Sequence, residues 1–121
     1  EGTRYRAGQV KFGTGYNSIS PLEIKTMEVA AAVHFETDVP IHSHTEAGTM
    51  GLQQMEILKD LGVSIQRVSF GHMDRNLDLW YHRKLAEEGA FLCRMDLKNR
   101  SFCRVIPLAA PIIPDMAGAP A

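Results

Sequence analysis

The sequence of 121 residues has little cysteine, little net charge and no long apolar run, and each absence excludes a class of protein. Two cysteines, Cys93 and Cys103, are too few for a disulfide framework and lack zinc-knuckle spacing, so a reduced cytoplasmic protein is expected. No apolar stretch reaches the roughly 18 residues of a membrane span, and the start shows no signal-peptide core. The formal net charge is −1 without a basic stripe, which argues against a nucleic-acid partner.

Short apolar segments alternate with longer segments of helical pattern along most of the chain. Strands are expected around residues 9–12, 38–44, 67–70 and 90–93, and helices over 21–37, 49–62 and 76–89. The units repeat about every thirty residues, which is the length of a strand–helix unit. Apolar strands that alternate with helices predict a parallel α/β sheet with right-handed crossovers.

Local signals mark the ends of the expected helices. Ser20, Pro21 and Glu23 form a capping-box pattern with proline at the first helical position. Asn76 is the expected cap of the last helix, and Gly62 and Gly89 are the expected stops of the last two helices.

Four strands are too few to close a (β/α)8 barrel, which requires eight strands and roughly 200 residues or more. The chain is therefore either a small open α/β domain or part of a barrel. After Cys93 the alternation ends, and the segment 94–121 holds four of the six prolines. We expect residues 1–93 to form the α/β unit and 94–121 to form an irregular tail.

Three polar residues fall in or at the end of successive strands: Lys11, His44 and His72. The carboxyl ends of parallel strands meet at one edge, so these side chains are expected to share a rim. Each residue taken singly also has a structural explanation. A histidine at a strand end can simply be hydrogen-bonded, and a lysine in an apolar strand can extend its amine to solvent. His42 lies two residues from His44 and is expected on the same face.

Taken together, the three residues predict a metal site. Two imidazoles suit zinc and similar divalent metals. Burial lowers the pKa of a lysine, and a neutral amine can take up carbon dioxide to form a carbamate. A carbamate has two oxygens and can bridge two metals as a carboxylate does.

The stretches "AGQVKFGTGYNSISPLE", "VPIHSHTEAGTMGLQQ" and "QRVSFGHMDRNLD" resemble the phosphotriesterase family of the amidohydrolase superfamily, in its homology-protein and lactonase-like branch. The resemblance implies a (β/α)8 TIM barrel, of which this chain would supply about strands 4–7 with their intervening helices. It implies two divalent metals, usually zinc, and hydrolysis of phosphotriester, lactone or ester bonds by a metal-bridging hydroxide.

The resemblance also assigns roles to residues. Lys11 matches the carboxylated lysine that bridges the metals, and His44 and His72 match the metal ligands of the fifth and sixth strands. His42 is assigned to the barrel lining, and Asp74 to a position beside a ligand. Arg75 replaces an acidic residue that many relatives carry, which makes details around it less transferable.

The family's first-strand histidine pair and eighth-strand aspartate have no match in these residues, so this chain alone is expected to be inactive. Its open sheet edges are expected to favour self-association. Two functional hypotheses remain: part of a metal-dependent hydrolase acting on small esters, lactones or phosphotriesters, or a non-catalytic α/β domain with a relic or weak metal site.

Overall fold

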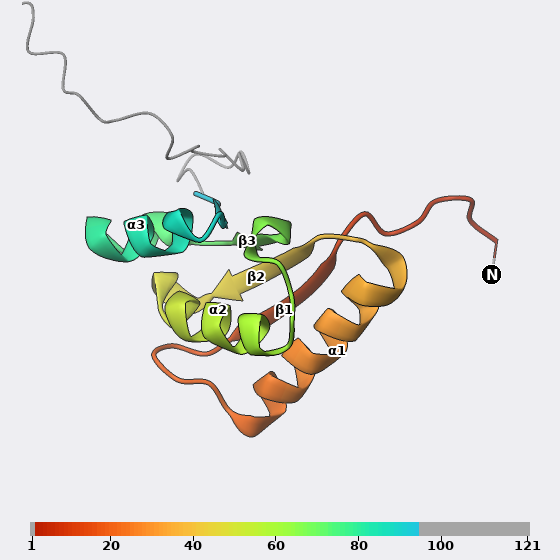
Figure 1. The fold of residues 1–121 in the computed structure, drawn as a ribbon, viewed down its shortest axis with the longest axis horizontal. Coiled ribbons are helices and arrows are strands. Elements are labelled where there is room, and N and C mark those ends of the chain that lie inside the picture. The colour runs from red at the N-terminus through yellow and green to blue at the C-terminus, as the bar shows by residue number, and fades with distance from the viewer. Residues whose placement is uncertain (1, 95–121) are drawn as a thin grey trace, which may run out of the picture.

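The computed structural model describes residues 2–94 and consists of four strands alternating with three helices (Figure 1). The elements are β1 (Val10–Thr14), α1 (Pro21–Thr37), β2 (Ile41–Thr45), α2 (Gly51–Asp60), β3 (Val68–Phe70), α3 (Leu79–Glu87) and β4 (Phe91–Leu92). Short 3-10 turns occupy Glu46–Gly48 (η1), Ile65–Arg67 (η2) and Met73–Arg75 (η3). The irregular tail predicted for residues 94–121 lies outside the described residues, except for Arg94.

The four strands form one parallel sheet in the order β1-β2-β3-β4. Lys11 lies opposite His42 and Gly13 opposite His44, while His42 lies opposite Ser69 on the next strand. Sequential parallel strands joined by helices are the repeating unit of a (β/α)8 barrel. The predicted α/β class and partial barrel are therefore confirmed.

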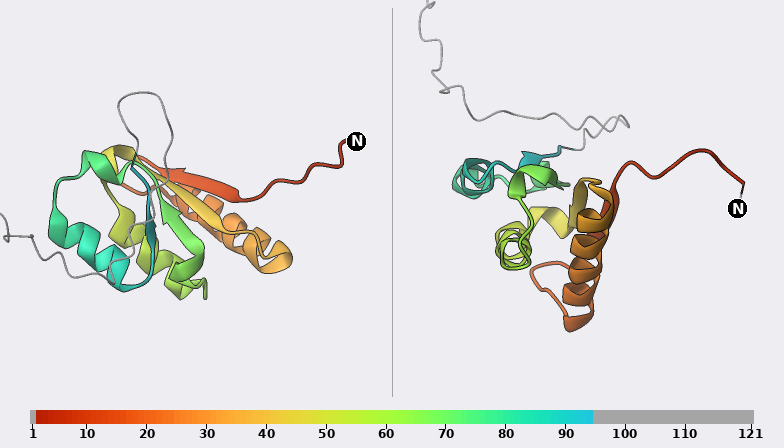
Figure 2. Two further views of the ribbon diagram at one scale, coloured as in Figure 1. Left: turned by 90° about the horizontal axis from the view of Figure 1, so that it is seen from above. Right: turned by 45° about the vertical axis from the view of Figure 1, so that its right-hand side comes forward.

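The two faces of the sheet differ in burial, and the helices lie against only one of them (Figure 2). This helix-covered face is formed by alternate strand residues: Phe12, Ile41, Ser43, Val68, Phe70 and Leu92, all buried. Met27, Met55, Leu58 and Leu85 of the helices complete the core. The other face, which would point into a closed barrel, carries Lys11, Gly13, His42, His44 and Ser69.

Helix α1 begins as its sequence predicts. The Ser20 hydroxyl accepts a hydrogen bond from the Glu23 backbone N–H at 3.3 Å, and the Glu23 carboxylate accepts one from the Ser20 N–H at 2.6 Å. The second carboxylate oxygen accepts from the Gly15 N–H at 2.8 Å. Glu23 therefore ties the loop after β1 to the helix as well as closing the capping box.

Two predicted boundaries differ from the structure. The first strand, expected around residues 9–12, continues to Thr14 in register with β2. Asn76 does not cap α3; the Asp78 carboxylate accepts from the Trp80 and Tyr81 N–H groups, and the helix begins at Leu79. Asn76 instead donates from its amide to the Gly48 carbonyl.

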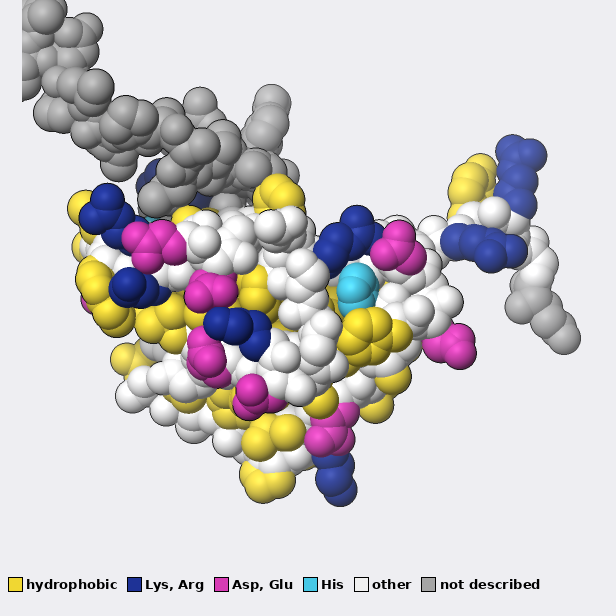
Figure 3. Space-filling view, viewed as in Figure 1, with side chains coloured by type: hydrophobic (Ala, Val, Ile, Leu, Met, Phe, Trp, Pro, Cys, Tyr) yellow, Lys and Arg dark blue, Asp and Glu magenta, His cyan; other side chains and the backbone are white. Residues whose placement is uncertain are grey.

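Several large apolar side chains remain on the surface of the described residues, as the yellow patches between charged groups in Figure 3 show. Leu22 and Val29 of α1 are 71% and 62% exposed, whereas Met27 and Ala30 of the same helix are buried. Among the described residues, no helix has both the length and the apolar character needed to cross a membrane.

Candidate functional site

Two histidines meet at the carboxyl edge of the sheet. The His44 Nδ1 and His72 Nε2 atoms lie 3.0 Å apart, and the two rings meet edge-on with centroids 4.4 Å apart. His44 belongs to β2, whereas His72 follows β3 in the left-handed backbone region with φ 60°. A non-glycine residue in this region is uncommon and costs conformational energy. That conformation turns the chain into η3 directly after the histidine.

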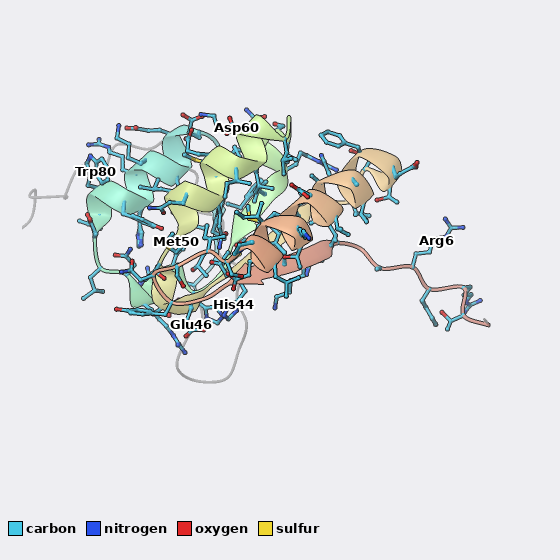
Figure 4. All side chains as sticks on the ribbon, turned by 90° about the horizontal axis from the view of Figure 1, so that it is seen from below. Arg6, His44, Glu46, Met50, Asp60 and Trp80 are labelled. Atoms are coloured by element: carbon cyan, nitrogen blue, oxygen red, sulfur yellow. The ribbon has the colours of Figure 1, made fainter. Side chains whose placement is uncertain are left out.

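Glu46 occupies the other side of the His44 ring. Its carboxylate lies 3.1 Å from His44 Nε2, and Figure 4 shows both residues at the same end of the sheet. A carboxylate can only accept, so this contact places the ring proton on Nε2. In a neutral ring with its proton on Nε2, the Nδ1 atom carries the lone pair, and in this structure Nδ1 faces His72.

Hydrogen bonds join the loops that follow β1, β2 and β3. The Asn76 amide donates to the Gly48 carbonyl at 3.2 Å, and the Asn17 N–H donates to the Thr49 hydroxyl at 2.9 Å. Gly48 has φ 73°, and a Cβ there would lie 2.7 Å from the Asn76 Cβ and 3.2 Å from the His72 carbonyl oxygen. The loop after β2 can therefore pack closely against the loop after β3 only because residue 48 has no side chain.

A buried polar cluster lies beneath the rim on the helix-covered face. Gln54 of α2 is fully buried; its amide donates to the Thr14 hydroxyl at 2.6 Å and its oxygen accepts from the Ser43 hydroxyl. The same amide nitrogen lies 3.4 Å from the His44 carbonyl. Beside it, the Thr45 hydroxyl donates to the Gly71 carbonyl at 2.6 Å. These bonds join the ends of β1, β2 and β3 to each other and to α2.

His42 and Lys11 lie deeper along the open face than His44. The His42 Nδ1 atom lies 2.8 Å from the Ser69 hydroxyl, and the strand register places Lys11 beside His42. His42 shares the face of His44, as predicted. Lys11 is exposed among the described residues, because no described segment covers this face of the sheet.

Burial favours the neutral form of two of the histidines, His42 and His72. Burial lowers the pKa of His42, and the nearby Lys11 and the other two histidines act in the same direction. Burial also lowers the pKa of His72, assisted by His44 and Arg75 and opposed by Asp74. The hydrogen bond with His44 lowers the pKa of Glu46, which keeps its side chain a carboxylate. A neutral imidazole is the form that binds a metal.

Three other polar or sulfur-containing residues have defined environments. Asp74 lies in η3, close enough to His72 to act on its charge. His34 is buried, with Nδ1 2.8 Å from the Val39 carbonyl, and so has a structural role at the end of α1. Cys93 is buried, with 6% of its surface exposed.

The two facing nitrogens match part of a metal site. Zinc binds imidazole nitrogen at about 2.0–2.1 Å in tetrahedral geometry, which separates two ligand nitrogens by roughly 3.3 Å. The 3.0 Å between His44 Nδ1 and His72 Nε2 is close to this value. His72 Nδ1 is buried and has no hydrogen-bond partner among the described residues. Within residues 2–94, however, no group of three or more His, Cys, Asp or Glu side chains is arranged around one point.

The model of the phosphotriesterase family matches residues 1–106 of this sequence. The chain belongs to the phosphotriesterase family. A lactonase of Listeria monocytogenes with a known crystal structure is 62% identical, with a TM-score of 0.73 over 75% of this chain and 28% of its own. The phosphotriesterase homology protein of Escherichia coli, crystallised with phosphate in its active site, is 39% identical with a TM-score of 0.72, over 76% and 32% of the two chains.

A phospho-furanose lactonase of Mycoplasmopsis agalactiae is 37% identical over 92 residues, which are 75% of this phosphotriesterase-family chain and 26% of the relative. The chain thus spans about a quarter to a third of the length of the relatives that it matches. The range matched by the family model, residues 1–106, includes Lys11, His44 and His72.

Glu46 and Gln54 did not emerge from the sequence as site residues. The spacing of His44 and Glu46 along a strand end gave a weak signal, since residues two apart share a face. Gln54 gave none, because its partner Thr14 is forty positions away and only the folded helix brings them together.

Proposed function

We propose that this chain contributes the central strands of a phosphotriesterase-family hydrolase that acts on lactone, ester or phosphotriester bonds of small molecules. The proposal rests on one observation: His44 Nδ1 and His72 Nε2 face each other at 3.0 Å at the carboxyl edge of the sheet. In α/β barrels this edge is where catalytic residues gather. The named activities of the lactonase and phosphotriesterase relatives support the reaction class.

His44 and His72 would hold a divalent metal, zinc in the first instance, with Lys11 shared with a second metal. Such metals supply Lewis-acid polarisation of the scissile group and lower the pKa of an attacking water. The protein's own part is to point the two imidazoles at one another. Burial lowers the pKa of His72, and the Glu46 carboxylate contacts the His44 nitrogen that faces away from His72.

Lys11 would act as a carbamate. The neutral amine attacks carbon dioxide, a C–N bond forms, and one proton leaves to solvent, which yields an anionic group with two oxygens. Gly13, the next residue on the same face, has no side chain to separate Lys11 from the rim. His42 lies beside the lysine and is held by Ser69, which suits a role in lining the barrel.

We further infer that the 121 residues on their own do not hydrolyse substrate. His44 and His72 form a pair and not a complete ligand set in the described part of the chain, and Lys11 is exposed there. The division at residue 93, a cytoplasmic location, and the lack of nucleic-acid or membrane partners remain predictions from composition.

Zinc titration of the metal-free full-length protein tests the proposal. His44→Ala and His72→Ala should each weaken zinc binding by tenfold or more in calorimetry, because each removes a ligand. His82→Ala on α3 is the matched control and should bind zinc as the wild type does. If both rim variants also bind as the wild type does, the assignment is wrong, and a non-catalytic domain with a relic site is the better description.

A further inference from the structure

The Glu46 carboxylate contacts the nitrogen of His44 that faces away from His72. His44 Nε2 lies 3.1 Å from Glu46 Oε2, while Nδ1 lies 3.0 Å from His72 Nε2. The three side chains therefore form a row in which the His44 ring is contacted at both nitrogens. A neutral imidazole has one proton, so the group at one nitrogen determines what the other nitrogen can do.

The backbone of Glu46 is held firmly although its side chain is half exposed. The Glu46 carbonyl accepts from both the Thr49 N–H at 3.0 Å and the Thr49 hydroxyl at 2.7 Å. Gly48, two residues on, is fixed by the Asn76 amide. These bonds anchor η1 on the neighbouring loops, so the carboxylate starts from a fixed point next to the ring.

The Glu46–His44 contact is expected to contribute little to the stability of the fold. The side chains are 46% and 35% exposed, and exposed ion pairs contribute little to folding stability. The contact has a larger effect on the geometry of the site. If Glu46 holds the His44 proton on Nε2, the lone pair on Nδ1 is available to a ligand on the opposite side of the ring. Carboxylates behind metal-binding histidines serve this purpose in many metal sites.

We propose that Glu46 is a positioning residue that holds the proton of His44 on Nε2 and so presents Nδ1 toward His72. The inference rests on the proposed function for its purpose, since the presented lone pair is the one assigned to a metal. Neither composition nor the family resemblance assigns Glu46 a role.

The test reads the tautomer of His44 directly. Long-range proton–nitrogen NMR of the metal-free full-length protein, labelled with ¹⁵N-histidine, distinguishes the Nε2–H from the Nδ1–H form. His44→Gln identifies the signals. The wild type should show the Nε2–H form. Glu46→Ala should shift His44 toward a mixture, and Glu46→Gln, whose amide oxygen still accepts, should restore most of the Nε2–H form.

Glu56→Ala is the matched control, because Glu56 lies exposed on α2 and pairs with Lys59. It should leave the His44 tautomer unchanged. An unchanged His44 tautomer in Glu46→Ala, or an Nδ1–H form in the wild type, overturns the proposal. A loss of fold would alter all histidine signals together, whereas the proposed role alters those of His44 and its neighbour His72.

Zinc titration separates this inference from the proposed function. Glu46→Ala should weaken zinc binding about tenfold, with Glu46→Gln between it and the wild type. If the wild type binds no zinc but Glu46→Ala still shifts the tautomer, the proposed function fails and the positioning role stands. If the wild type binds zinc but Glu46→Ala changes neither the His44 tautomer nor the zinc affinity, the positioning role fails and the proposed function stands.

Discussion

The two faces of the four-stranded sheet differ in how far their side chains are buried. On the helix-covered face, Ile41, Val68 and Phe70 are completely shielded from solvent. On the open face, Lys11 is exposed and His42 and His44 are only half-buried. Side chains alternate along a strand, so one short segment supplies both the packing that stabilises the fold and the groups available for chemistry.

Strand residues on the helix-covered face therefore stabilise the fold, and those on the open face are available for chemistry, with one exception. Gln54 and its hydroxyl partners Ser43 and Thr14 place a polar cluster on the apolar face, directly behind the rim. The four substitutions below test the division, from the largest expected effect to the smallest.

Phe70→Ala should have the largest effect on folding. The side chain is completely buried, and removing it leaves a cavity that costs about 3–5 kcal/mol in the free energy of unfolding. Ser69→Ala, the neighbour on the opposite face, is the control and should cost only about 1 kcal/mol, because it loses the hydrogen bond to His42 and leaves no large cavity. Urea denaturation measures both. Equal losses would mean that the two faces are not separate.

Gln54→Leu tests the exception. The leucine cannot bond Thr14 or Ser43, and two buried hydroxyls without partners should cost about 2–4 kcal/mol together. Zinc affinity should fall as well, because the cluster lies under His44. Gln53→Leu, at the exposed neighbouring position, is the control for both urea denaturation and zinc calorimetry. Full stability of Gln54→Leu would show that the cluster is incidental.

Gly48→Ala should cost about 1–3 kcal/mol and also disturb the rim. The new Cβ would lie 2.7 Å from the Asn76 Cβ, so the loops after β2 and β3 must separate and move His72. Gly62→Ala has the same left-handed backbone but meets nothing closer than Phe35 at 3.8 Å. Thermal melts and zinc titration should therefore show a larger loss for Gly48→Ala. Equal losses in both assays would attribute the effect to backbone strain alone.

Lys11 substitutions should barely affect folding but change metal binding. The side chain is exposed, so stability should change by less than about 0.5 kcal/mol. Zinc affinity of the wild type should rise with added bicarbonate, which supplies the carbamate carbon. Lys11→Ala should bind weakly at all bicarbonate levels, and Lys11→Glu should bind without bicarbonate dependence. A bicarbonate response in Lys11→Ala would contradict the carbamate role.

Much of the fold follows from signals that are local in the sequence. The alternation of apolar strands with helices predicts the parallel sheet, and the pattern at Ser20 and Glu23 predicts the start of α1. The convergence of His44 and His72 follows from a general property of parallel sheets, that their carboxyl ends share one edge.

What the sequence does not reveal depends on contacts between distant segments. Asn76 is used differently from the predicted helix cap: its side-chain oxygen accepts from the Asp78 N–H, and its amide donates to the Gly48 carbonyl of another loop. Exposure of Lys11 depends on what covers the open face, which its own strand does not determine. The partners of Gln54 are likewise brought together only in the folded chain.

The fastening of neighbouring loops has a consequence for how substitutions in them combine. The loop after β1 bonds through Asn17 to Thr49, and the loop after β2 bonds through Gly48 to Asn76. A substitution in one loop is therefore transmitted to the next, so the effects of substitutions in different loops on folding stability should not add. Variants that change residues 17, 48, 49 and 76 jointly should differ from the sum of the single variants.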